Sequence, residues 1–407
     1  MDGRKKAMAS IGTVVVVIIG VVGAMIARRS AADGEPAARP PSPPGWVGTW
    51  AAAVQPGTEG FRQQTLRQIV HTSIGGTAAR VRISNQYGTS PLTIADVRVA
   101  VAAGGGRITA GTDHALTFGG AATATVQPGR SLLSDPVSLA VPARGDLAVS
   151  LYLPDAAAHA TEHSVATRTN YVAAGDQSGA ASMRAAQTRN SYYFLAGVDV
   201  MNSRATGAVV TFGASITDGT ASTYDADRRW PDLLSQRLAA SGRTVGVLNA
   251  GISGNQLLQD GQGESALKRF DRDVLQQTGV RWVIFSDDPI NDLSGPNAPP
   301  ASELINAMSQ LIARAHAAGI KFYCSTLTPF QGSSGWSPKG EQGRDAVNAF
   351  IRSAASGCDG VIDQDTATHD PAAPTRYRPA VDSGDHLHPN DRGMQDIADA
   401  VPLNLFG

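Results

Sequence analysis

The residues that could carry chemistry begin with a serine that follows an apolar run. Val209–Phe212 is β-branched and aromatic, which is typical of a buried strand, and Ser215 stands two residues after Gly213, where the chain must turn. Open α/β sheets bind ligands at the carboxyl ends of their strands, so a serine there is well supported. It could act as a nucleophile if a base reaches it. The alternative is a turn or helix-capping serine, a common role after a strand.

A histidine and an aspartate near the C-terminus could supply that base. Asp385 and His388 are three residues apart, and a helical pattern of apolar residues follows them at 394–401. A carboxylate beside an imidazole accepts the Nδ1 proton and leaves Nε2 free to face a serine hydroxyl. The pair therefore has the residue types of a general base and the acid that orients it.

Two further polar stretches lie between these ends of the candidate site. Asn249–Asn255 and Ile290–Asp292 each follow an apolar run. A backbone N–H and a side-chain amide at such positions could point at the oxyanion that forms when a nucleophile attacks a carbonyl group.

The four stretches, in this order, resemble the SGNH (GDSL-type) hydrolase family, and the resemblance covers the C-terminal half of the chain. It implies that Ser215 is the nucleophile, His388 the general base and Asp385 its orienting partner. It also implies that the oxyanion donors are the N–H groups of Ser215 and Gly254 and the side chain of Asn291. The implied activity is that of a serine esterase, which acts on carboxylic acyl or acetyl esters through an acyl-enzyme and needs no cofactor or metal.

The sequence departs from the family pattern at two places. The usual Gly-Asp-Ser is here Gly213-Ala214-Ser215, so one acid is missing, and Pro289 stands where the family has a glycine before Asn291. Proline fixes φ and has no N–H, so it either stiffens this loop or displaces Asn291. The second outcome leaves an alternative function open, a surface-displayed carbohydrate- or ligand-binding protein with a degenerate, weakly active hydrolase domain.

From residue 204 to residue 407, strand-like and helical patterns alternate. This alternation predicts an α/β domain with a parallel sheet and helices on both faces, in a flavodoxin-like order of five strands that is also the SGNH fold. The expected strands are Val209–Phe212, Val245–Leu248, Val283–Phe285, Phe322–Cys324 and Val361–Ile362, and the helical patterns include Trp230–Leu238, Leu304–Ala317 and Ala346–Ala355.

Residues 46–203 show short alternating strands separated by glycine-rich turns, for example at 95–101 and 147–153. This pattern predicts an antiparallel β-sandwich, jelly-roll-like domain before the hydrolase domain. The domain could bind carbohydrate or shape the cleft, or it could be a packing module, which we take as the expectation. Tyr192–Phe194 could stack on sugars, but aromatic clusters in strands more often belong to the core.

The N-terminus predicts export. Ile11–Ala27 is apolar and uncharged, with basic residues on both sides, so residues 1–30 are either a signal peptide or a membrane anchor. Residues 31–45 are a proline-rich linker. We therefore expect an extracellular or cell-surface protein, tethered to the membrane if the segment is not cleaved.

Composition excludes some other classes of protein. The chain has 407 residues, of which 17% are charged, and a formal net charge of −1, so there is no electrostatic case for nucleic-acid binding. We expect a monomer that acts on a small-molecule or polysaccharide ester. The residues around Ser215 do not form the Gly-x-Ser-x-Gly turn of α/β-hydrolases, because Thr217 occupies the last position.

The remaining polar residues have structural interpretations. The histidine spacing fits no zinc hydrolase motif, and we expect His386 to be structural or at the rim of the cleft. Asp225 and Asp227 lack the pattern of a calcium loop and predict a solvated loop. Cys324 and Cys358 could pair in an exported protein, but their uncertain alignment favours two buried thiols.

Overall fold

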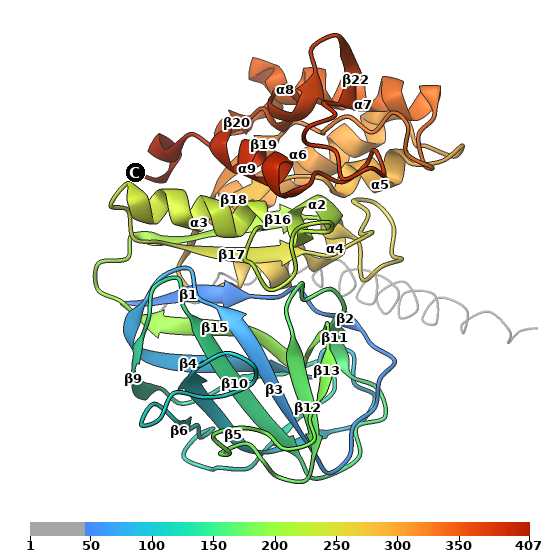
Figure 1. Cartoon of the computed structure of the whole chain (residues 1–407). Coiled ribbons are helices and arrows are strands. Elements are labelled where there is room, and N and C mark those ends of the chain that lie inside the picture. The colour runs from blue at the N-terminus through green and yellow to red at the C-terminus, as the bar shows by residue number, and fades with distance from the viewer. Residues whose placement is uncertain (1–44) are drawn as a thin grey trace, which may run out of the picture. The chain divides into compact units, whose positions relative to one another are not determined.

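The computed structural model describes residues 45–407, and antiparallel sheets occupy residues 46–201 (Figure 1). One sheet has the order β1 (Trp46–Ala51), β15 (Leu195–Met201), β4 (Gly76–Ser84), β8 (Ser131–Leu133), with β9 (Val137–Val141) also paired to β4. A second has the order β13 (Gln187–Arg189), β12 (Asn170–Ala174), β3 (Gln64–His71), β10 (Asp146–Leu153), β5 (Leu92–Val101), β6 (His114–Ala115), with β7 (Ala124–Val126) paired to β5. A small third sheet contains β14 (Tyr192–Tyr193), β11 (Thr161–His163) and β2 (Gln55–Pro56).

The alternation of these strands explains how they pack. In β4, Ala79, Val81 and Ile83 are fully buried, whereas the side chains between them, Arg80 and Arg82, are partly exposed. The buried faces of the first two sheets contribute to one hydrophobic core. The expected antiparallel β region is therefore confirmed.

The aromatic cluster at 192–194 belongs to this core. Tyr192, Tyr193 and Phe194 are 2%, 3% and 0% exposed, and the Tyr192 hydroxyl donates a hydrogen bond to the Ile69 carbonyl at 3.0 Å. These side chains are not available for stacking on a sugar, so the core interpretation is confirmed.

The second half of the chain forms the predicted parallel sheet. Its order is β17 (Val245–Gly251), β16 (Gly207–Gly213), β18 (Val280–Phe285), β19 (Lys321–Ser325), β20 (Gly360–Ile362). Numbered along the sequence, this is the flavodoxin-like order 2-1-3-4-5, as expected. The strands are apolar along nearly their whole length, because both faces of a parallel sheet are covered.

Helices connect and follow these strands, and α3 packs beside α9 and α6 beside α7 (Figure 1). Their bounds are α2 (Ser215–Asp218), α3 (Trp230–Ala240), α4 (Ala266–Phe270), α5 (Asp288–Leu293), α6 (Ala301–Ala317), α7 (Pro338–Arg352), α8 (Gln364–Thr368) and α9 (Asp391–Asp399). Short elements complete the chain, namely a π-helical turn at Asp271–Leu275, 3-10 turns at Ala354–Ser356 and Leu403–Phe406, and the hairpin β21 (His369–Asp370) and β22 (Ala373–Tyr377).

The β region and the parallel sheet meet where β1 packs against β17. A Cβ atom on Gly246 would stand 2.1 Å from the Gly48 carbonyl oxygen, and one on Gly48 would stand 2.8 Å from the Leu248 side chain. The Gly48 N–H also donates to the Thr278 carbonyl at 2.9 Å. Two glycines thus allow the two backbones to approach closely.

The expectation of two free thiols is wrong. Cys324 of β19 and Cys358 form a disulfide with Cα atoms 5.9 Å apart. A turn with a left-handed residue at Gly357 (φ 75°) brings Cys358 alongside β19, where the Asp359 N–H donates to the Phe322 carbonyl at 2.8 Å.

The predicted export segment and almost all of the predicted linker lie outside the described residues. Within residues 45–407, no helix has both the length and the apolar character needed to cross a membrane.

Replacing Gly246 by alanine tests the junction between β1 and β17. The new methyl group meets a backbone oxygen that a strand holds in place, so we expect Gly246→Ala to lower the free energy of unfolding by about 1–3 kcal/mol. Gly197→Ala in β15 is the matched control, because its Cβ atom would lie 3.6 Å from the nearest atom, an ordinary contact. Denaturant unfolding of both variants measures the difference, and equal stabilities would contradict the tight approach.

Candidate active site

The predicted nucleophile lies at the turn between β16 and α2. β16 ends at Gly213 and α2 begins at Ser215, which is 8% exposed. A Cβ atom on Gly213 would stand 2.3 Å from Thr217 Oγ1 and 2.4 Å from Asp287 Oδ1, so the tight turn requires glycine. Ala214 is fully buried, and its methyl group stands where the family motif has an acid.

The predicted base and its acid reach this serine. His388 Nε2 lies 2.8 Å from Ser215 Oγ, and His388 Nδ1 lies 2.6 Å from Asp385 Oδ2. Asp385 Oδ1 also accepts the N–H groups of Leu387 and His388 at 2.9 and 2.8 Å. Burial raises the pKa of Asp385, but the hydrogen bonds from His388 and Leu387 outweigh it and lower the pKa to about 2. Asp385 is therefore a carboxylate at neutral pH.

Polar contacts hold the loop that carries this pair. Asn390 caps α9 by accepting the N–H groups of Arg392 and Gly393 at 3.0 and 3.2 Å. Asp391 accepts the N–H and the hydroxyl of Thr223 at 2.7 and 2.6 Å, which ties the loop to the segment that follows α2.

Asp287 supports the turn at Ser215, and the sequence interpretation missed this role. Its carboxylate accepts the Ile216 N–H at 2.7 Å and the Thr217 hydroxyl at 2.5 Å. Ser286 directly follows β18, whose Phe285 pairs with Phe212 of β16, so the parallel register brings Asp287 beside the turn. An acid from the loop after the neighbouring strand thus serves a turn whose own motif lacks one.

The predicted oxyanion donors lie on two adjacent loops. Gly254 has φ 79°, a conformation that favours glycine, and Asn291 Nδ2 donates to the Asn255 carbonyl at 2.8 Å. The second N–H of the Asn291 amide has no hydrogen-bond partner within residues 45–407, and the same is true of the backbone N–H groups of Ser215 and Gly254. These donors remain available to a developing oxyanion.

Pro289 fits its position. It stands in the first turn of α5, where a missing N–H leaves no helical hydrogen bond unmade and the fixed φ suits a helix. Asn291 therefore keeps its contact with Asn255, and Pro289 does not displace it.

A buried arginine, also missed from the sequence, connects the strand ends. Arg269 of α4 is 0% exposed, and its guanidinium donates to the carbonyls of Gly213 and Ala250 at 2.9 and 2.7 Å. It also donates to Asn255 Oδ1 at 2.9 Å and to Asp288 Oδ1 at 3.2 Å. An arginine in a short amphipathic helix gives no sequence signal of such a role.

Asp288, one of the partners of Arg269, has a carboxylate oxygen without a hydrogen bond. It is fully buried, and its Oδ2 has no hydrogen-bond partner among the described residues. Burial raises the pKa of Asp288; Arg269 opposes this effect, and Asp287 and Asp292 add to it, so the pKa is about 7. This carboxyl group therefore exchanges its proton close to neutral pH.

His386 lies away from this chain of hydrogen bonds. Its side chain is 53% exposed, and its Nδ1 lies 2.5 Å from Asp382 Oδ2. His386 is therefore a surface residue, and its place at the rim of a cleft stays a prediction.

One group of metal-ligating residues occurs in the described part of the chain. The group consists of His71, Asp146 and Asp227. Each offers one possible ligand atom, and these three atoms lie within 4.8 Å of one another. His71 Nδ1 lies 2.7 Å from Asp146 Oδ1 and 3.3 Å from Asp227 Oδ2, and Arg168 pairs with both carboxylates. Because the Arg168 guanidinium already pairs with both acids, the group is explained as an ion-pair network.

Residues 225–227 lie in a loop, as predicted, and Asp225 is exposed, but both aspartates also make specific contacts. Asp227 is a partly buried member of the network, and Asp225 accepts the N–H and hydroxyl of Thr169 at 2.7 and 2.6 Å. Both aspartates connect the parallel-sheet half of the chain to the β region. Sequence patterns hid this role because both partners come from a distant segment.

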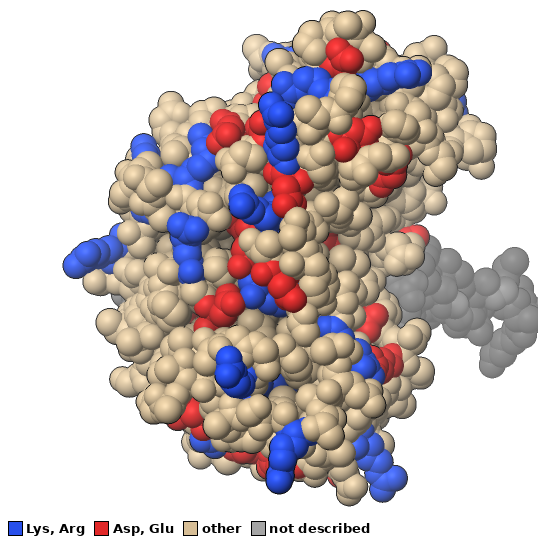
Figure 2. All heavy atoms as spheres, viewed as in Figure 1, with Lys and Arg blue, Asp and Glu red and all other residues tan. Residues whose placement is uncertain are grey.

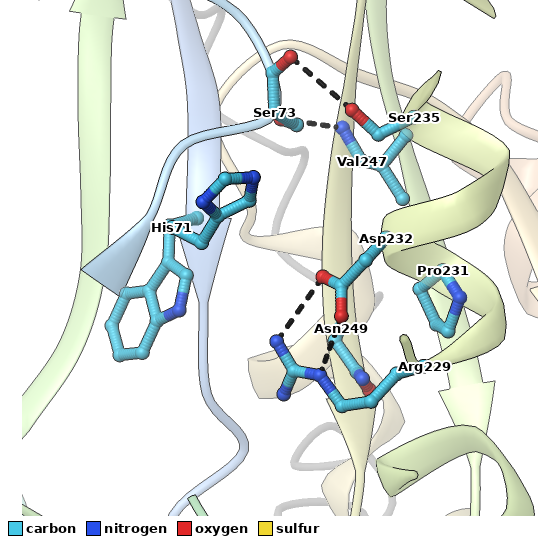
Figure 3. Close-up of a pocket in the computed structure, with 9 residues that line it drawn as sticks. His71, Ser73, Arg229, Pro231, Asp232, Ser235, Val247 and Asn249 are labelled. Atoms are coloured by element: carbon cyan, nitrogen blue, oxygen red, sulfur yellow. Dashed lines mark hydrogen bonds and ion pairs between the residues drawn. The ribbon is translucent and has the colours of Figure 1, made fainter. Parts of the chain in front are cut away.

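A small cavity lies beside this network, next to His71 and α3 (Figure 3). Its volume of about 20 Å³ is enough for one water molecule. Ser73 Oγ accepts the Val247 N–H at 2.9 Å, and Arg229 pairs with Asp232 at 2.8 Å on its wall. None of the predicted site residues lines it, so it is separate from the candidate active site.

The C-terminal half of the chain is thus an α/β domain with a serine, a histidine and an aspartate in one hydrogen-bond chain at the carboxyl edge of its sheet. Residues 211–395 match the model of the GDSL-like Lipase/Acylhydrolase family. This part of the chain is therefore similar to a GDSL-like lipase/acylhydrolase domain.

Several solved structures are similar to this half of the chain. The lipase/acylhydrolase from Enterococcus faecalis is 22% identical, with 48% of this chain and 92% of that chain covered and a TM-score of 0.38. A GDSL-like lipase from Bacteroides thetaiotaomicron is 18% identical (48% and 85% covered, TM-score 0.35), and the native aryl esterase of M. smegmatis is 15% identical (48% and 95% covered, TM-score 0.37). No curated protein matches the chain.

Paired substitutions test the oxyanion donors. We expect Asn291→Ala to lower kcat by roughly 10²–10³-fold, because it removes a donor to the oxyanion. We expect Pro289→Gly to change kcat by less than about tenfold, because the proline already suits the first turn of α5. Steady-state hydrolysis of one small ester by both variants decides this. A large activation by Pro289→Gly would mean that the proline cripples the site, and a binding function would then be favoured.

Proposed function

We propose that the protein is a serine esterase that hydrolyses carboxylic acyl or acetyl esters. The observation that carries the proposal is the continuous hydrogen-bond chain from Ser215 Oγ through the His388 imidazole to the Asp385 carboxylate. The match of residues 211–395 to the GDSL-like Lipase/Acylhydrolase family supports the same reaction class.

Acylation begins when Ser215 Oγ attacks the ester carbonyl carbon and His388 Nε2 takes the hydroxyl proton. The carbonyl oxygen becomes an oxyanion, which accepts hydrogen bonds from the free N–H groups of Ser215, Gly254 and Asn291. The intermediate then collapses, the C–O bond to the alcohol breaks, and Nε2 returns its proton to the departing oxygen.

Deacylation repeats these steps with water as the nucleophile. His388 takes a proton from water, the hydroxide oxygen attacks the acyl carbon, and Ser215 leaves with the proton that Nε2 returns. Asp385 stays ionised throughout, because its lowered pKa keeps it a carboxylate that stabilises the imidazolium.

Labelling and kinetics test this proposal together. We expect a fluorophosphonate probe to label Ser215 in the wild type, and Ser215→Ala to abolish both labelling and ester hydrolysis. We expect His388→Ala to lower kcat by roughly 10⁴-fold or more, because the serine then lacks its base. A chain-length series of p-nitrophenyl esters, with acetylated xylan and pectin, ranks the acyl groups that the enzyme accepts.

His386→Ala is the matched control, since this histidine also pairs with a carboxylate on the same loop. It should retain nearly the wild-type rate. If His386→Ala lost activity while His388→Ala kept it, the assignment of the base would be wrong.

We also propose that the protein is exported, because the apolar run at 11–27 has basic residues on both sides. Cell fractionation should find the folded part outside the cytoplasm and open to added protease. Recovery of the chain with an intact N-terminus from the soluble cytosolic fraction would refute export.

A further inference from the structure

A buried histidine of the β region reaches the helix that begins with the proposed nucleophile. His163 of β11 is 4% exposed, and its Nε2 lies 3.0 Å from Asp218 Oδ1, in the last residue of α2, and 3.1 Å from the Val165 carbonyl oxygen. Its Nδ1 lies 2.9 Å from the Ala53 carbonyl oxygen. Both ring nitrogens face only acceptors, so both carry a proton and the ring is an imidazolium.

The charges around this ring favour the same state. Burial lowers the pKa of His163, but Asp218 and a backbone carbonyl raise it more, and the net shift is upward although Arg229 opposes it. Glu162 is the residue before His163 in β11. The uncharged ring of Tyr192 stacks on the His163 ring, with the ring centroids 6.2 Å apart. A raised pKa means that the imidazolium is present below that pKa and is lost as the pH rises through it.

Asp218 connects His163 to the loop that follows β17, because its other carboxylate oxygen binds that loop. Asp218 is 1% exposed, and its Oδ2 accepts both the N–H and the hydroxyl of Ser253, at 2.9 and 2.6 Å. The space beside Gly251 is filled by the backbone of Asp218, since a Cβ atom there would stand 2.4 Å from the Asp218 nitrogen. Ser253 immediately precedes Gly254, whose N–H is one of the free donors.

We propose that His163 is a positioning residue for the esterase site: it holds the Asp218 carboxylate, which holds Ser253 and thereby aims the Gly254 N–H at the oxyanion. This inference rests on the proposed function and extends it to the β region. It assigns residues 46–203 a part in catalysis that is independent of any carbohydrate binding.

The physical basis is the cost of an unpaired buried charge. Without the His163 side chain, the Asp218 carboxylate would be buried with only Ser253 as a hydrogen-bond partner, and the Asp218–Ser253 contact would rearrange. That rearrangement alters the Ser253 peptide and the direction of the Gly254 N–H. Turnover then falls while substrate affinity changes little, because the donor acts mainly on the transition state.

Two substitutions of His163 separate charge from hydrogen bonding. We expect His163→Leu to lower kcat roughly 10- to 100-fold, less than outright removal of a donor, with KM nearly unchanged. His163→Gln can still donate to Asp218 but does not titrate. It should keep more activity than His163→Leu, and it should lack the fall in kcat that we expect for the wild type as rising pH removes the His163 charge.

His71→Gln is the matched control, because His71 also pairs with aspartates between the β region and the hydrolase domain but has no contact with Ser253. It should leave kcat nearly unchanged. The inference is overturned if His163→Leu keeps kcat within about twofold of the wild type, or if His71→Gln lowers kcat as much as His163→Leu does.

A measurement that does not depend on turnover separates this inference from the proposed function. In the wild type, nitrogen NMR shifts of His163 should show a doubly protonated ring at pH 7, and the Gly254 amide resonance should follow its titration. In His163→Gln that dependence should disappear. A neutral His163, or a Gly254 resonance indifferent to its titration, overturns the inference even if the protein hydrolyses esters or if His163→Leu does not fold. Absence of labelling and turnover in the wild type would instead reject the proposed function.

Discussion

The buried guanidinium of Arg269 holds together the ends of two strands and the start of a helix, and the candidate active site depends on it. It donates to the carbonyls of Gly213 and Ala250, which belong to adjacent parallel strands, and to the side chains of Asn255 and Asp288. Removing a guanidinium from water costs several kcal/mol, so it is stable there only because its donors are matched by fixed acceptors. One side chain therefore sets the spacing between the turn at Ser215, the loop that carries Gly254 and Asn255, and α5.

The same contact explains why the departures from the family motif are tolerated. Arg269 fixes the Asn255 side chain, and the Asn255 carbonyl then receives the Asn291 amide. The position of Asn291 is thus set by hydrogen bonds from outside α5, and Pro289 has only to begin that helix. Likewise the turn at Ser215 takes its acid, Asp287, from the loop after β18 rather than from its own motif.

Local patterns made the strands, their order and the positions of Ser215 and His388 predictable, because parallel strands of alternating β and α segments must end at one edge. Arg269 and Asp287 could not be found this way. Asp287 acts on backbone groups about 70 residues earlier in the chain, and no periodicity connects them. The disulfide was misjudged because the turn at Gly357, which aligns Cys358 with β19, leaves no trace in strand or helix patterns.

The boundary near residue 203 marks a change from antiparallel to parallel sheet, but the contacts across it are those of an interior. Gly48 and Gly246 meet backbone to backbone, and the Thr278 hydroxyl donates to Asp199 of the β region at 2.7 Å. A buried carboxylate, Asp218, has His163 as its partner on the other side of the boundary, with Nε2 and Oδ1 3.0 Å apart. Buried polar groups of this kind have all their hydrogen bonds only when both halves are present. If one half were missing, each group in the other half would lose a hydrogen-bond partner that water does not replace in the same geometry. The β region is therefore part of the structure that holds α2, the helix that begins at Ser215, in place.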